Sequence, residues 1–85
     1  MPTKTVSVGS AVGLHARPAA LIAEKAGSLG STVTLSVPGG SPVDASSALL
    51  IMTLGAKKGD QVEVSGDADG DVDTIAAMVE QDLDA

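Results

Sequence analysis

Residues 32–45, TVTLSVPGGSPVDA, contain the clearest signal of secondary structure in the chain. Val33, Leu35 and Val37 alternate with hydroxyl side chains, which is the period of a strand with one buried face. The Pro-Gly-Gly that follows supplies turn residues, and residues 43–45 can form the return strand of a hairpin. The segment therefore predicts a hairpin with one apolar and one polar face.

Two further segments show the same alternation. Residues 5–8 alternate valine with threonine or serine, and residues 61–65 alternate valine with polar residues. Strands with one apolar face are typical of an antiparallel sheet that is covered on one side only. Helices must then bury the apolar face.

Two helices are predicted between these strands, because apolar residues recur there at helical spacing. The first begins near Pro18, and we expect Gly27 or Gly30 to end it. The second covers residues 48–54 and stops at Gly55. The positions expected to be buried are Ala19, Ile22, Ala23 and Ala26 in the first helix, and Leu50, Ile51 and Leu54 in the second.

A third helix follows the last strand. Its buried stripe is predicted to contain Val72, Ile75, Ala76, Val79 and Leu83. Acidic residues at 71 and 73 favour its start. We interpret the Asp-rich stretch 67–73 as a solvated turn leading into this helix; the alternative, a calcium loop, lacks the EF-hand spacing. The expected fold is α+β, an open-faced sandwich of a four-stranded antiparallel sheet with three helices on one face (βαββαβα), in one domain of residues 1–85.

Composition excludes several classes of function. The chain has 85 residues, no Cys and one His, so it cannot supply disulfides or a four-ligand zinc site, and we expect neither a metal nor a cofactor. It has no aromatic residue and a formal net charge of −6, which opposes nucleic-acid binding. No apolar run could span a bilayer, and the first residues lack a signal-peptide pattern, so we expect a cytoplasmic monomer. A core this small leaves little room for a cleft, which favours function at the surface.

The candidate chemistry lies in GLHARPA, residues 13–19. Pro18 fits the first turn of a helix, which places His15 at or just before the N-cap. The backbone amides of Ala16 and Arg17 would then point outward and form an anion site, and the Arg17 guanidinium matches phosphate oxygens. Helix dipole and guanidinium both disfavour a protonated imidazole, so His15 should be a neutral nucleophile that later holds an anion. The alternative is an ordinary loop or capping histidine.

Residues 13–19 resemble the active-site motif of HPr, the histidine-containing phosphocarrier family of the sugar phosphotransferase system. Residues 47–59 resemble the HPr segment that contains a regulatory serine and a short second helix. The resemblance implies the HPr open-faced sandwich, with His15 accepting phosphate through Nδ1 from enzyme I and donating it to a sugar-specific IIA component. Arg17 would assist the transfer. The aromatic core residues common in that family are missing, so the core must be aliphatic.

Ser47 matches the position that the family's ATP-dependent HPr kinase phosphorylates in some bacteria. The doublet with Ser46 blurs the assignment, although the following Leu-Gly favours Ser47. The alternative role for Ser47 is an N-cap of the second helix. Both roles use the same geometry, because a phosphate at Ser47 would also lie at a helix start.

An apolar docking surface is predicted beside His15. On a helical wheel, Leu21 of the first helix falls opposite the buried stripe, and the resemblance implies that partners dock on the first two helices. The residues expected at the surface are Ala20, Leu21, Ala48, Leu49 and Met52. Methionine suits a surface that fits several partners. The alternative is that these residues pack under a loop.

Two other classes of protein remain open on the sequence alone. An acyl carrier is also small and acidic and uses a serine at a helix start, but it is all-helical, and its Asp-Ser-Leu triplet is missing here. A regulatory module with the HPr fold could bind a transcription factor. Such a paralogue would be expected to lack the active-site histidine, whereas His15 and Arg17 are both present.

Overall fold

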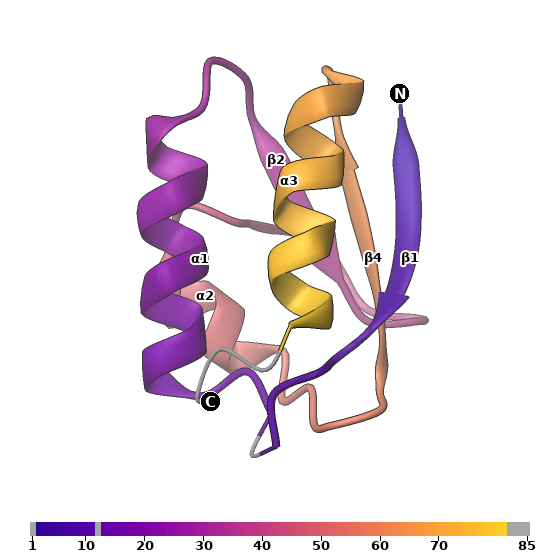
Figure 1. Cartoon of the computed structure of the whole chain (residues 1–85). Helices are drawn as coiled ribbons and strands as arrows, with labels where there is room; N and C mark the ends of the chain where they lie inside the picture. Colours follow the sequence, from indigo (N-terminus) through magenta and orange to yellow (C-terminus); the bar gives the residue numbers. More distant parts are fainter. Residues whose placement is uncertain (1, 12, 82–85) are drawn as a thin grey trace.

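The elements follow one another in the predicted order (Figure 1). A computed structural model describes residues 2–11 and 13–81. The strands are β1 (Thr3–Ser7), β2 (Val33–Ser36), β3 (Val43–Asp44) and β4 (Gln61–Gly66). The helices are α1 (Ala16–Ser28), α2 (Ala48–Thr53) and α3 (Asp69–Glu80). No helix in this part of the chain is both long and apolar enough to cross a membrane.

The sheet is antiparallel throughout its described strands, in the order β1-β4-β2-β3. Its register places Val6 opposite Val62 and Leu35 opposite Val64, and these four side chains are buried. The intervening residues are polar and form the open face. The helices cover the apolar face, with α1 and α3 side by side across it and α2 near one end (Figure 1). The predicted open-faced sandwich is confirmed.

The β2–β3 hairpin turns where Pro-Gly-Gly was expected to turn it. The Gly40 amide donates to the Val37 carbonyl oxygen at 2.9 Å, and Gly39 has φ +80°. Pro38 at the second turn position and a left-handed Gly39 at the third define a type II turn. The return strand β3 is only two residues long, although the Ala45 amide still donates to the Val33 carbonyl oxygen at 2.9 Å.

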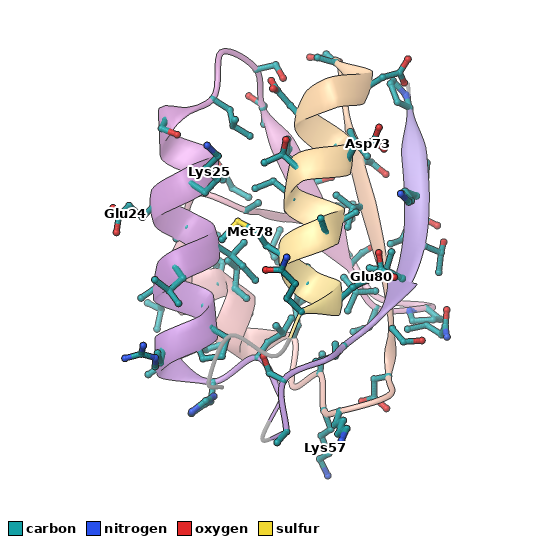
Figure 2. All side chains as sticks on the ribbon, viewed as in Figure 1. Glu24, Lys25, Lys57, Asp73, Met78 and Glu80 are labelled. Atoms are coloured by element: carbon teal, nitrogen blue, oxygen red, sulfur yellow. The ribbon has the colours of Figure 1, made fainter. Side chains whose placement is uncertain are left out.

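The core is aliphatic, as the absence of aromatic residues requires. Its largest fully buried side chains are Ile22, Leu35, Ile51 and Ile75. Burying one such side chain contributes about 1.5–3 kcal/mol relative to leaving it exposed. The half-buried Met78 lies between α1 and α3, where its flexible thioether packs against the core (Figure 2).

The end of α1 differs from the prediction. Neither Gly27 nor Gly30 adopts a left-handed conformation, and α1 ends at Ser28 with Leu29 as an extended C-cap. The Leu29 amide donates to the Ala26 carbonyl oxygen at 3.2 Å, and the Leu29 side chain packs against the core. The turn into β2 therefore follows the burial of Leu29. In contrast, α2 does stop before a left-handed glycine, Gly55, with φ +65°.

The acidic stretch also differs from the prediction, because most of it is helical. Helix α3 begins at Asp69, so Asp69 and Asp71 occupy its first turn, where negative charge favours the helix dipole. The Asp71 carboxylate also accepts a hydrogen bond from the Ser31 hydroxyl at 2.6 Å. Across the described residues, no group of three or more His, Cys, Asp or Glu side chains could hold a metal ion.

Helix α2 is rotated relative to the predicted wheel. Ile51 is its one fully buried residue, and Leu50, predicted to be buried, keeps 40% of its surface accessible. Ala48, predicted to face outward, is half-buried against the core, as is Leu54. At 100° per residue, positions three before and three after Ile51 lie 60° from it, whereas Leu50 lies 100° away. Ala23 of α1 is likewise only half-buried, and Leu83 lies outside the described residues.

Candidate functional site

His15 is the N-cap of α1, as the sequence predicts. Its backbone is extended (φ −87°, ψ −164°), and its carbonyl oxygen accepts the first helical hydrogen bond, from the Ala19 amide at 2.9 Å. The preceding Leu14 and the following Pro18 are buried, whereas His15 itself is exposed. Two buried neighbours therefore fix the backbone of a residue whose imidazole faces solvent.

The imidazole of His15 contacts the loop that leads into the helix. Its Nδ1 lies 3.3 Å from the Gly13 carbonyl oxygen. A carbonyl oxygen only accepts, so Nδ1 carries the proton in this contact and a neutral ring has its lone pair on Nε2. The distance is longer than the usual range of about 2.7–3.2 Å for such a hydrogen bond.

Gly13 holds the loop against the segment that follows α2. It has φ +80°, and a Cβ at this position would lie 2.4 Å from the Ala56 carbonyl oxygen and 2.9 Å from the Lys57 Cα. The Leu14 amide donates to that same Ala56 oxygen at 3.0 Å. Only glycine satisfies both the left-handed backbone and this close approach. The sequence motif contains Gly13, but no pattern in the sequence indicates that Gly13 contacts Ala56 and Lys57, more than forty residues away.

The first turn of α1 contains two backbone amides that could bind a ligand. His15 makes no side-chain cap, Pro18 has no N–H, and within the described chain the amides of Ala16 and Arg17 donate no hydrogen bond. Such amides, together with the helix dipole, favour an anion. The Arg17 side chain is exposed. In the described residues the single ion pair joins Lys4 to Asp73, so the Arg17 guanidinium is in no ion pair with another described residue.

A shallow hollow of about 310 Å³ opens beside the ring. It is lined by Leu14, His15, Met52, Gly55, Ala56 and Lys57. The hollow brings the loop before α1 together with the end of α2 and the loop after it. Lys57 was not predicted to belong to the site. The Lys57-Lys58 doublet is visible in the sequence, but its nearness to His15 arises from the tertiary contact at Gly13.

The predicted docking residues of α1 and α2 are exposed, with one exception. Leu49 keeps 70% of its surface accessible, Leu21 and Met52 each keep 37%, and Ala20 is exposed. The exception is the half-buried Ala48, and the exposed Leu50 takes its place. The two helices pack against each other, so this surface spans both. The alternative, that these residues pack under a loop, is wrong.

Ser47 caps α2 with its own side chain. Its Oγ accepts a hydrogen bond from the Leu50 amide at 3.3 Å, so the capping role is confirmed. The preceding Ser46 is tied to β3, because the Asp44 carboxylate accepts from its hydroxyl at 2.7 Å and from its amide at 2.9 Å. These two bonds hold the pKa of Asp44 below its ordinary value of 3.8.

The fold and the site together define a class of protein. The hollow at His15 is shallow, and the candidate site consists of an exposed imidazole, two backbone amides and a guanidinium at one helix start. A surface of this kind suits a protein that carries an anionic group and presents it to other proteins.

Comparison with known proteins identifies the family. Residues 2–81 match the family described as "PTS HPr component phosphorylation site". The chain is 38% identical to the phosphocarrier protein HPr of Streptomyces coelicolor over 87 aligned positions, covering 99% of this chain and 94% of that protein. The solved structure of HPr-C-His from Thermoanaerobacter tengcongensis superposes with a TM-score of 0.87 at 28% identity, over 100% of this chain and 98% of that one. HPr from Bacillus anthracis gives a TM-score of 0.84 at 28% identity, over 92% and 95%.

The chain belongs to the HPr family of phosphocarrier proteins. It therefore carries phosphoryl groups within the phosphotransferase system and is not an enzyme. The four-stranded sheet and the family match contradict the acyl-carrier alternative. The proteins it works with belong to that same system.

Proposed function

We propose that His15 is the phosphoryl acceptor, taking the group from phosphorylated enzyme I and passing it to a sugar-specific IIA component in the cytoplasm. The observation that supports this is the placement of an exposed imidazole at the N-cap of α1, next to the unsatisfied amides of Ala16 and Arg17. The family match supplies the chemistry, and His15 is the only histidine in the chain.

In the proposed transfer, one ring nitrogen of His15 attacks the phosphorus, the bond from phosphorus to the donor breaks, and the donor keeps that electron pair. The attacking nitrogen must present a lone pair. If it is Nδ1, as the family resemblance implies, the contact between Nδ1 and the Gly13 carbonyl oxygen must open and the proton must move to Nε2.

The groups around His15 stabilise the transferred phosphoryl group. In a loose phosphoryl-transfer transition state, charge is spread over three equatorial oxygens, and catalysis is mainly positioning and electrostatics. The amides of Ala16 and Arg17 are fixed by the helix, so they require no reorganisation during transfer. The Arg17 guanidinium adds two parallel donors and a full positive charge.

We also propose that partners dock on the apolar surface of α1 and α2, formed by Ala20, Leu21, Leu49, Leu50 and Met52. Large apolar side chains clustered beside a reactive group mark an interaction site more often than a solvated surface. This surface adjoins the hollow at His15, because Met52 lines that hollow. A partner docked here would reach the imidazole without entering a cleft.

Ser47 is a second proposed site of modification, by an HPr kinase. Its hydroxyl lies at the start of α2 and is only half-buried. A phosphate there would add negative charge beside the docking surface and would weaken the approach of an acidic partner.

The acceptor role is tested with enzyme I and ³²P-labelled phosphoenolpyruvate. We expect wild type to take up acid-labile label and His15→Ala to take up none, with an unchanged circular dichroism spectrum. ³¹P NMR of the labelled protein distinguishes phosphate on Nδ1 from phosphate on Nε2. Label retained by the Ala variant would move the acceptor to another residue.

A further inference from the structure

Lys57 is a positively charged residue that lines the His15 hollow and has no role in the transfer proposed above. It lies in the loop between α2 and β4, and it lines the hollow together with His15 and Met52. Figure 2 shows its side chain projecting from the end of the molecule where α1 also begins. Arg17 belongs to α1, whereas Lys57 belongs to the loop after α2, so the two cations come from different elements.

The backbone of Lys57 is held in place by its neighbours on both sides. Its amide donates to the Asp60 carboxylate at 2.9 Å, and its carbonyl oxygen accepts from the Asp60 amide at 2.9 Å. The loop is tied to the end of β1, because the Gly59 amide donates to the Val8 carbonyl oxygen at 2.9 Å. The close approach of Gly13 to Ala56 and Lys57 then fixes this loop against the one that contains His15.

Lys57 is one of few cations in an acidic chain. The chain has five Lys and Arg residues against eleven Asp and Glu residues. Lys4 is paired with Asp73 at the opposite end of the molecule (Figure 2), whereas the Lys57 ammonium makes no ion pair with any described residue. The Asp60 carboxylate beside it is engaged by the Lys57 amide. Lys57 therefore lines the His15 hollow, and its flexible four-carbon stem carries an ammonium that is in no ion pair with a described residue.

We propose that Lys57 supplies a second positive charge to the phosphoryl group on His15, from the loop after α2. This inference rests on the proposed role of His15. The ammonium would act as a mobile point charge on one phosphoryl oxygen, while Arg17 and the helix amides hold the others. It would stabilise the phosphorylated form relative to the free form, and so favour retention of the phosphoryl group.

The equilibrium of transfer tests this role, because electrostatic steering changes forward and reverse rates alike and cancels in an equilibrium constant. Enzyme I and the carrier are mixed with ³²P-labelled phosphoenolpyruvate until the phosphoenolpyruvate is exhausted, and the label on each protein is measured. Lys57→Met is compared with Lys57→Arg, which keeps the charge. Lys58→Met is the matched control, because Lys58 is adjacent but does not line the hollow.

We expect Lys57→Met to lower the ratio of labelled carrier to labelled enzyme I about threefold to fivefold, as suits one exposed charge pair. Lys57→Arg should restore most of the ratio, and 0.5 M salt should shrink the difference. Equal ratios for Lys57→Met and Lys58→Met would overturn the role of Lys57 while leaving His15 as the acceptor. Absence of label on wild type, or its presence on His15→Ala, would instead overturn the proposed function.

Discussion

Helices α1 and α2 begin in different ways, and the difference separates a binding site from a stabilising cap. At α2, Ser47 satisfies the Leu50 amide with its own side chain. At α1, His15 provides no such bond, and the amides of Ala16 and Arg17 donate to no group within residues 2–11 and 13–81. The open start is stabilised by packing instead, since Pro18 and Ala19 are buried. A helix start can therefore bind an anion only where something other than its cap fixes the chain.

Gly13→Ala should have the largest effect, because it disrupts the loop that leads into α1. A Cβ would lie 2.4 Å from the Ala56 carbonyl oxygen, and the left-handed backbone would be strained by at least about 1 kcal/mol in addition. We expect the free energy of unfolding in urea to fall by about 3 kcal/mol. We also expect phosphorylation of the folded fraction to slow, because the loop before His15 must move.

Gly30→Ala is the control for Gly13→Ala, because a Cβ at position 30 meets no atom within 4 Å and the backbone there is not left-handed. It should change the free energy of unfolding by less than about 0.5 kcal/mol. Equal stability of the two variants would show that the loop before His15 is not packed as described.

Leu49→Glu should test whether α2 is a docking element. Leu49 lies on the far side of α2 from Ile51 and keeps 70% of its surface accessible, so its replacement should leave the fold intact. A charge in an apolar docking surface should slow phosphoryl transfer from enzyme I about tenfold. Stopped-flow or quench kinetics would measure this, with Glu24→Gln on the exposed side of α1 as a control. Unchanged transfer rates for Leu49→Glu would contradict the docking role.

Ser47→Ala should destabilise the start of α2 by removing its N-cap. Loss of the bond to the Leu50 amide should reduce the free energy of unfolding by about 1 kcal/mol, while His15 is still phosphorylated at the wild-type rate. Ser47→Asn retains a capping oxygen and should recover most of the stability. If both variants unfolded like wild type, Ser47 would contribute no cap.

The smallest expected effect concerns the carboxylate before Ser47. Because hydrogen bonds from Ser46 lower the pKa of Asp44 in the folded protein, the charged form stabilises the fold above pH 3.8, and this contribution is lost as pH falls through the folded value. The stability advantage of wild type over Asp44→Asn should therefore be larger at pH 6 than at pH 2.5. A Ser46→Ala background should reduce that pH dependence. If the difference in stability between wild type and Asp44→Asn did not vary with pH, the lowered pKa of Asp44 would be contradicted.

The sequence predicts the order of elements and the place of His15, because both depend on local signals. Alternation in residues 32–37 and the turn at Pro38 specify the hairpin, and Pro18 places the helix start. The rotation of α2 was not predictable in the same way. Its residues Ala-Leu-Leu-Ile-Met are apolar on every side, so no polar face determines which residue turns inward.

Other parts of the site depend on contacts between distant residues. The membership of Lys57 in the hollow follows from the contact of Gly13 with Ala56 and Lys57, which no local pattern encodes. The end of α1 was predicted wrongly because two glycines are a strong local signal, whereas the burial of Leu29 is a tertiary one. Local sequence signals therefore predict the position of His15, whereas its neighbours in the hollow depend on tertiary packing.

We expect the open start of α1 to bind the phosphoryl group on His15 through the amides of Ala16 and Arg17. ¹H–¹⁵N NMR spectra before and after phosphorylation by enzyme I and phosphoenolpyruvate test it directly. Both amide protons should move downfield as they donate to phosphoryl oxygens, while the Leu50 amide, already bound to Ser47, should stay in place. A fully phosphorylated His15 with both amide signals unmoved would show that these amides do not bind the phosphoryl group.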